Sequence, residues 1–310
     1  MTAPVLDHFL LRIAPAPPVS VAPELLRARE SIRASLAALR QVPDSALERN
    51  WQWHDGELDV RYGFYRQYEE LEDARTRVRP LVADARGDEG PARPLVAAAS
   101  AARWDLHGLL SSLTDTDLDR DPGNEEWTLR QTLAHIVGGQ RGYAWFTYWY
   151  LAQRDRPLNE FPERAPDDAE IGFPEEETEG RGTLAEIQRR FDDIVDLSAG
   201  VFGTLGDEEL AARARWSGLL VDVRFRMVRW TSHIREHTIQ VEKTLGFIGR
   251  PLTEVDLLLR LIAAGYGRLE EELLLLPAER QAVADALALA ESVAERVTSG
   301  AQSVAEAARA

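Results

Sequence analysis

Two histidines, His233 and His237, lie four residues apart in a segment whose apolar spacing predicts a helix. Side chains at this spacing share one helix face, a turn apart, so both imidazoles can reach one metal ion. Such pairs also occur on solvated helix faces, and that location is the alternative. The neighbouring residues favour a metal, because burial of two imidazoles without partners is costly and a metal ion satisfies both.

The histidine pair belongs to a longer stripe on one face of the same predicted helix. Spacings of three or four residues connect its members, which are Arg226, Trp230, His233, His237 and Gln240. We predict that Arg226, Trp230 and Gln240 contact a cofactor or substrate beside the metal. Arg226 would bind a carboxylate there. The alternative for Arg226 is a salt bridge to Asp222 or to a loop acid.

His135 is the predicted third ligand. It lies in the apolar stretch 133–137, where a hydrogen-bonded core histidine is the alternative. Gly138 and Gly139 follow it, and glycines inside a helix suggest close packing or space for a ligand. Three histidines without a fourth protein ligand leave one coordination position open, as in catalytic sites. Neutral imidazoles suit a divalent metal, zinc first, with nickel and iron as alternatives.

The amino-acid composition excludes several kinds of binding partner and several kinds of metal ligand. The 310 residues include 52 acidic and 36 basic side chains, a net charge of −16, which disfavours nucleic acid and anionic membranes as partners. We find no apolar run of about 18 residues that could span a bilayer, and no secretory signal, so we expect a cytoplasmic protein. Cysteine is absent, which excludes cysteine ligands and cysteine nucleophiles in this chain.

The sequence predicts an all-α fold. Alanine, leucine, arginine and glutamate dominate at helical spacing, whereas strand signals are nearly absent and no long strand-like alternation occurs. The predicted helices are 23–41, 58–86, 93–113, 128–154, 183–204, 220–247, 253–275 and 278–308. Thr128 and Gln131 fit a capping box at the start of one of them. The irregular segment 155–182 is too long for an ordinary bundle loop, and we read it as a solvated insertion, with a mobile lid as the alternative.

An internal repeat relates two parts of the chain at an offset of 163 residues. It pairs Trp53 with Trp216 and the stretch 59–61 with 222–224, between two predicted helices in each case. At this offset, Glu70 and Ala74 occupy the positions of His233 and His237. Because the Asp-Val-Arg stretch persists where the histidines do not, we interpret it as structural.

The organisation that follows has four parts. We predict an extended, proline-containing arm over 1–22, a helical hairpin over 23–90, a metal-binding four-helix bundle over 91–250 and a second hairpin over 251–310. The two hairpins are expected to pack together as a second, degenerate bundle without metal. The protein would then be a monomer with pseudo-dimeric bundles, and a homodimer is the alternative.

Two segments resemble a known family. Residues 127–137 (WTLRQTLAHIV) are similar to the first metal-ligand helix of the DinB-like superfamily, especially the N-terminal domain of mycothiol-dependent maleylpyruvate isomerases. Residues 233–240 (HIREHTIQ) resemble its second motif. The resemblance covers about residues 93–250. It implies an up-down-down-up four-helix bundle with a divalent metal on His135, His233 and His237, and an activity that uses a low-molecular-weight thiol.

Three functions remain open on the sequence. The first is a metal-dependent transferase or isomerase that acts on a small-molecule substrate with such a thiol. The second is a non-enzymatic metal-binding or scaffold protein, which the degenerate repeat would suit. The third is a metal-dependent hydrolase, which would need a general base that neither Glu236 nor Gln240 provides.

Overall fold

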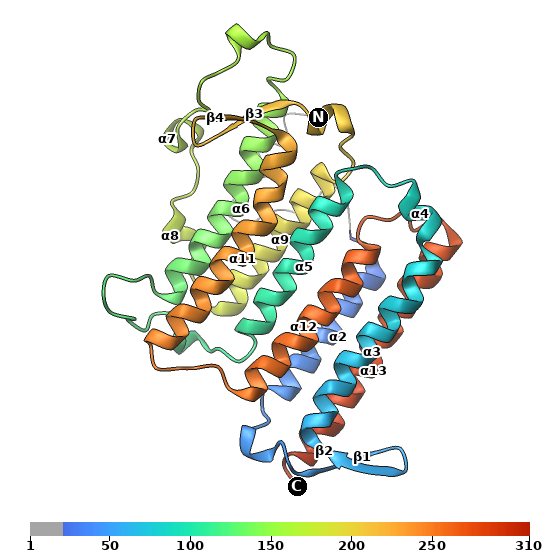
Figure 1. Ribbon diagram of the computed structural model, residues 1–310. Helices are drawn as coiled ribbons and strands as arrows, with labels where there is room; N and C mark the ends of the chain where they lie inside the picture. Colours follow the sequence, from blue (N-terminus) through green and yellow to red (C-terminus); the bar gives the residue numbers. More distant parts are fainter. Residues whose placement is uncertain (1–20) are drawn as a thin grey trace. The chain divides into compact units, whose positions relative to one another are not determined.

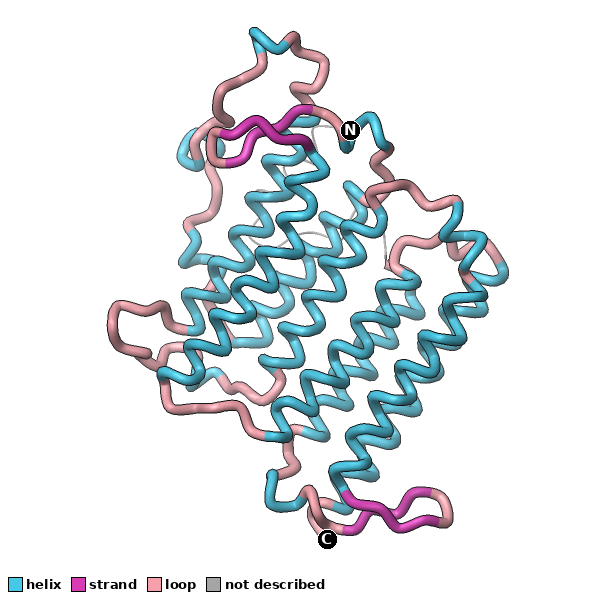
Figure 2. The backbone as a smooth tube through the Cα atoms, in the orientation of Figure 1, coloured by secondary structure: helices cyan, strands magenta, loops and turns pink. Residues whose placement is uncertain are grey.

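The computed structural model describes residues 21–310, so most of the predicted arm over 1–22 lies outside the described residues. Within that range the protein is all-α, as predicted, with two short β-hairpins (Figures 1 and 2). The described chain divides into two compact units. Unit one contains residues 90–99 and 114–248, and unit two contains residues 21–89, 100–113 and 249–310. Helix α5 (Arg93–Leu110) contributes to both.

Three long helices build most of unit one: α6 (Leu129–Leu151), α9 (Leu184–Phe202) and α11 (Val223–Phe247). Helix α6 packs against both α9 and α11 (Figure 1). The segments between them contain the 3-10 turns Asp115–Asp117 and Leu158–Glu160 and the short helices α7 (Asp168–Ile171), α8 (Glu176–Glu179) and α10 (Asp207–Leu210). The metal-ligand candidates lie on α6 and α11.

Local sequence signals fix where these helices start. The Thr128 side chain caps α6 through the Gln131 amide, and the Gln131 side chain accepts from the Thr128 amide, which confirms the predicted capping box. Thr183 and Glu186 form the same motif at the start of α9. These caps satisfy amide groups that a helix leaves unpaired at its first turn.

Strand signals are nearly absent from the sequence, and the strands that form are correspondingly short. Two antiparallel hairpins are present: β1 (Asn50–Trp53) with β2 (Gly56–Asp59), and β3 (Arg213–Trp216) with β4 (Leu219–Asp222). Each precedes a long helix directly (Figure 2). Four-residue strands are too short to show periodicity, and their signal lies in the turns, where His54, Ser217 and Gly218 adopt positive φ. The predicted helices at 58 and 220 therefore begin at 60 and 223.

The internal repeat appears as the same structure twice. Strands, turns and helix starts coincide at the offset of 163 residues, with α3 (Val60–Leu81) matching α11. Asp59 caps α3 by accepting from the Tyr62 amide, and Asp222 caps α11 from the Phe225 amide, both at 2.7 Å. These caps give the repeated Asp-Val-Arg stretch its structural role.

Unit two contains α2 (Pro23–Leu39), α3, α4 (Ala83–Gly87), α12 (Glu254–Leu273) and α13 (Gln281–Ala307), with a 3-10 turn at Asp44–Ala46. Helix α13 packs along α2 and α3, and α12 also contacts both. The predicted helix 58–86 is interrupted at Val82, two residues after Pro80. The carboxylate of the fully buried Glu270 accepts from Arg29 and Arg103, which compensates a charge inside this unit.

No helix among residues 21–310 is a candidate for a membrane-spanning segment. None of the helices there combines the length and the apolar composition that a bilayer crossing requires.

Candidate metal centre

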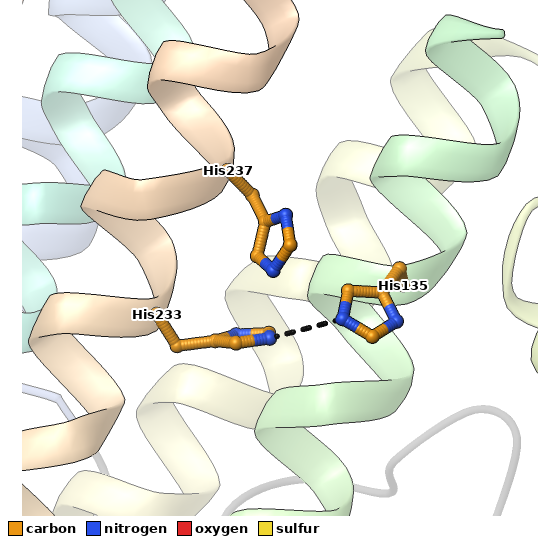
Figure 3. A group of neighbouring side chains, drawn as sticks. All are labelled: His135, His233 and His237. Carbon is orange, nitrogen blue, oxygen red and sulfur yellow. Dashed lines mark hydrogen bonds between the residues drawn. The ribbon is translucent and has the colours of Figure 1, made fainter. Parts of the chain in front are cut away.

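Three histidines from two helices converge in unit one. His135 projects from α6, and His233 and His237 project from α11 toward it (Figure 3). The ligand atoms of the three rings all lie within 4.8 Å of one another. The Nε2 atoms of His135 and His233 are 3.3 Å apart. The structure thus brings together the three residues that the sequence singled out as metal ligands.

The spacing of these nitrogens fits a shared metal ion. Two imidazole ligands on a tetrahedral ion with bonds of about 2.0–2.1 Å have their nitrogens about 3.3 Å apart. The His135 and His233 nitrogens have this separation. Among residues 21–310, no further histidine or carboxylate joins the group as a fourth ligand. The donor set therefore suits one divalent ion with an open coordination position.

Two outer partners hold the rings in orientation. The His135 Nδ1 lies 3.1 Å from both carboxylate oxygens of Glu176, and the His237 Nδ1 lies 2.7 Å from the Gln240 side-chain oxygen. Because carboxylate and amide oxygens accept, Nδ1 carries the proton in each ring and Nε2 keeps a free lone pair. The Nδ1 of His233 is buried without a hydrogen-bond partner.

Burial keeps the histidines in the form that binds metal. His233 is only 4% exposed, and burial, reinforced by the nearby His237 and His135 rings, lowers the pKa of His233 to about 3. Burial also lowers the pKa of His237, although its hydrogen bond with Gln240 acts in the opposite direction. At neutral pH these two imidazoles are uncharged and available as ligands.

The glycine pair after His135 has two different environments. A Cβ atom at Gly139 would lie 2.9 Å from the His233 Nε2 and closer still to its Cε1, so only glycine leaves room for the ring. A Cβ at Gly138 would meet nothing nearer than 3.6 Å, where the Glu176 side chain lies. Gly139 is therefore the residue that allows α11 to place His233 against α6.

A cavity of 1340 Å³ opens in front of the histidines, and all three line it. Much of one wall comes from residues 163–179, within the segment read from the sequence as a solvated insertion. Glu179 anchors this segment through a buried ion pair with Arg141 at 2.6 Å. Arg130 donates to the carbonyls of Gly180 and Gly182 at 2.6 and 2.8 Å. These contacts hold the end of the segment against the bundle, while the described side chains from 163 to 177 stay exposed or half-buried, as a solvated insertion predicts.

The other predicted site residues have different locations. Arg226 lines the cavity, and no ion pair to Asp222 or another acid forms among the described residues. Trp230 is 2% exposed and packs edge-on against Phe202 in the core, so it does not line the cavity as a cofactor contact would. Gln240 contacts His237 instead of the cavity.

The sequence reasoning did not find Glu176. Its only signal is the acidic run 175–177, and such runs are common on solvated surfaces. Glu236, to which the sequence analysis gave no role, also lines the cavity and pairs there with Arg229 at 3.1 Å. Helix spacing predicts faces well, but it cannot show which loop residue covers a face.

Comparison with known families gives one result. The model of the DinB superfamily matches residues 98–241, a range that contains all three histidines and the whole of α6, α9 and the hairpin before α11. Comparisons with curated proteins and with solved structures find no match.

Proposed function

The chain belongs to the DinB superfamily over residues 98–241, and we propose that His135, His233 and His237 bind one divalent metal ion there, zinc first, with nickel and iron as alternatives. We propose further that this centre serves a transferase or isomerase that uses a low-molecular-weight thiol. The observation that carries the proposal is the convergence of three imidazoles, two with their outer nitrogens held by Glu176 and Gln240, at the wall of an open cavity.

The residues of the chain have defined tasks in this proposal. The three Nε2 atoms are the ligands, while Glu176 and Gln240 hold the Nδ1 protons of His135 and His237 and so keep those two rings in the ligating tautomer. A bound divalent ion supplies a positive charge that lowers the pKa of a coordinating thiol. Because the chain has no cysteine, the thiol must come from a small molecule. The cavity offers the space for it and for its electrophilic partner.

The open cavity favours an enzyme over a scaffold protein. A structural metal site is closed by a fourth protein ligand, whereas a catalytic site keeps a position for water or substrate. Among residues 21–310 no fourth ligand joins the cluster, and the space in front of it is not filled by side chains. A non-enzymatic role would leave this space without a purpose.

Metal content tests the first part of the proposal. We expect mass spectrometry on tag-free protein to find about one divalent ion per chain in the wild type and none in His233→Ala. His54→Asn is the matched control, because it removes an imidazole from the hairpin turn in unit two and tolerates the positive φ of that position. Wild-type protein that holds no metal, even after reconstitution, would leave three core histidines and support the scaffold reading.

A thiol-consumption assay tests the second part. Metal-loaded wild type is mixed with small thiols and a panel of electrophiles, and loss of free thiol is followed beside metal-loaded His54→Asn and metal-free His233→Ala. We expect loss of thiol in the first two samples and background loss in the third. Metal binding without any thiol turnover would retain the metal centre and contradict the transferase or isomerase assignment.

A further inference from the structure

Arg226 is a buried cation that has no carboxylate partner among residues 21–310. Its side chain is 4% exposed, and it lines the same cavity as the three histidines. One of its terminal nitrogens donates to the carbonyl of Arg215, and its Nε has no hydrogen-bond partner. Burial lowers the pKa of Arg226 to about 10. Burial of a charge in this state is costly unless something pairs with it.

The other arginines of the cavity show what Arg226 lacks. Arg141 pairs with Glu179, Arg164 with Asp167, and Arg229 with Glu236. Among the described residues, neither Arg226 nor Arg215 forms such a pair, although both line the same cavity. Arg215 donates from Nε to the Pro162 carbonyl and from one terminal nitrogen to the Gly218 carbonyl, and these neutral acceptors leave its charge unpaired. Two guanidinium charges can therefore attract an anion at this end of the cavity.

Aromatic rings form the wall around Arg226. Its guanidinium carbon lies 5.6 Å from the centre of the Phe146 ring and 5.4 Å from that of Tyr150. Phe173 and Trp216 also line the cavity. Such walls can pack the apolar body of a ligand while the arginines hold its charged end.

The internal repeat provides a comparison without the cation. At the offset of 163 residues, the counterpart of Arg226 is Gly63 on α3. A Cβ atom at Gly63 would lie 3.2 Å from the Val304 Cγ1, so Val304 fills the space there. The hairpin-and-helix frame is thus built in unit two without any charge at this position. The frame does not require Arg226, which makes a ligand the better reason for it.

We propose that this end of the cavity binds the anionic group of a small organic acid, held by Arg226 and Arg215, with the apolar part of the acid against the aromatic wall. This inference extends the proposed function by naming the substrate class. Arg226 precedes His233 by seven residues, about 10 Å along a helix axis. A substrate that reaches both would be elongated, with its charge at the end remote from the histidines.

Calorimetric titration of the full chain with matched probes tests the proposal. The probes are 4-phenylbutyrate, its neutral amide and inorganic phosphate, each with metal-free and with metal-loaded protein. We expect saturable binding of 4-phenylbutyrate, at least about tenfold weaker binding of the amide, and a loss of about 10- to 100-fold in Arg226→Met. Binding of phosphate alone would assign the subsite to a phosphate-bearing acid. Arg224→Gln is the control, because Arg224 lies on the same helix, exposed and outside the cavity.

Stability separates a binding role from a structural one. Met keeps most of the apolar packing and removes the uncompensated charge, so we expect Arg226→Met to unfold at the same or a higher temperature than wild type. Arg226→Lys should retain part of the binding. A lower unfolding temperature of Arg226→Met, or no saturable binding of either anion, or equal binding by wild type and Arg226→Met, would overturn the proposal. Because the metal-free sample reports on the anion alone, failure of the metal centre would not be mistaken for failure of this subsite.

Discussion

Substitution of Gly139 by alanine perturbs the metal centre without touching a ligand. The added Cβ atom would lie 2.9 Å from the His233 Nε2, and 3.3 Å from its Nδ1. Ordinary contacts of this kind need about 3.5 Å, so the imidazole must withdraw by at least about 0.5 Å. His233 is buried but lines the cavity, so the added atom would displace its ring from its position beside His135.

The expected loss of metal affinity in Gly139→Ala follows from the narrow range of distances at which a ligand can bind a metal ion. Ligand distances in metal sites vary by only about 0.2 Å, so the displaced ring would be lost or strained as a ligand. We expect metal affinity to fall by about 100-fold, the upper range for faults in ligand orientation. For the metal-free protein, alanine gains about 0.5–1 kcal/mol of helix stability over glycine, and overpacking costs about 1–3 kcal/mol. The net result is a free energy of unfolding about 1 kcal/mol lower.

Competition with a chromogenic chelator measures the affinity, and urea unfolding of metal-free protein measures the stability. Gly142→Ala is the matched control, because a Cβ there meets nothing nearer than 3.9 Å in the same helix. This variant should keep its metal and gain about 0.5–1 kcal/mol. If Gly139→Ala binds metal as tightly as Gly142→Ala does and is stabilised to the same extent, the close approach of α6 and α11 at Gly139 is not what positions His233.

Three further predictions concern charges in unit one. Glu176→Gln should weaken metal binding by about tenfold in the chelator assay, because the amide holds the His135 Nδ1 proton less strongly, whereas Glu177→Gln should leave the affinity unchanged. The folded state keeps the pKa of His233 near 3, against 6.5 in an unfolded chain, so metal-free protein should lose stability as the pH falls from 6.5 toward 3. Urea unfolding should show that the free energy of unfolding of His233→Ala declines less steeply over this range. Burial, with Asp192 and Asp196 nearby, raises the pKa of the half-exposed Asp193 to about 6, so the folded protein loses stability as the pH rises from 3.8 through 6. In thermal unfolding, Asp193→Asn should therefore be more stable than wild type by about 1 kcal/mol at pH 7.5 and equal to wild type at pH 3.5.

Helix positions and the histidine trio could be predicted because their signals are local. The spacing of His233 and His237 sets a shared face on any helix, and the Thr128–Gln131 capping box fixes the start of the helix that carries His135. The resemblance of two short segments to one family then supplied the pairing of the two helices. Gly139 carried a real signal of close packing, although the sequence could not name His233 as its neighbour.

The parts that could not be predicted depend on contacts between distant segments. Glu176 reaches His135 only because the segment around it is tied to the bundle by Glu179 and Arg130. The hairpins have strands too short for a periodic pattern. The lack of an acid beside Arg226 is a property of the folded cavity, since Asp222 is close in sequence but caps its helix instead.

The two copies of the repeat separate the residues that build the frame from those that add a site. Both copies keep the hairpin and the aspartate cap, so these features belong to the shared frame. Where α11 carries a cation at 226 and imidazoles at 233 and 237, the counterparts on α3 are a glycine, a glutamate and an alanine. The glutamate, Glu70, pairs with Arg66 and Arg296 and needs no metal. Because the cation and the histidines are present together in one copy and absent together from the other, they are best explained as parts of one ligand-binding site.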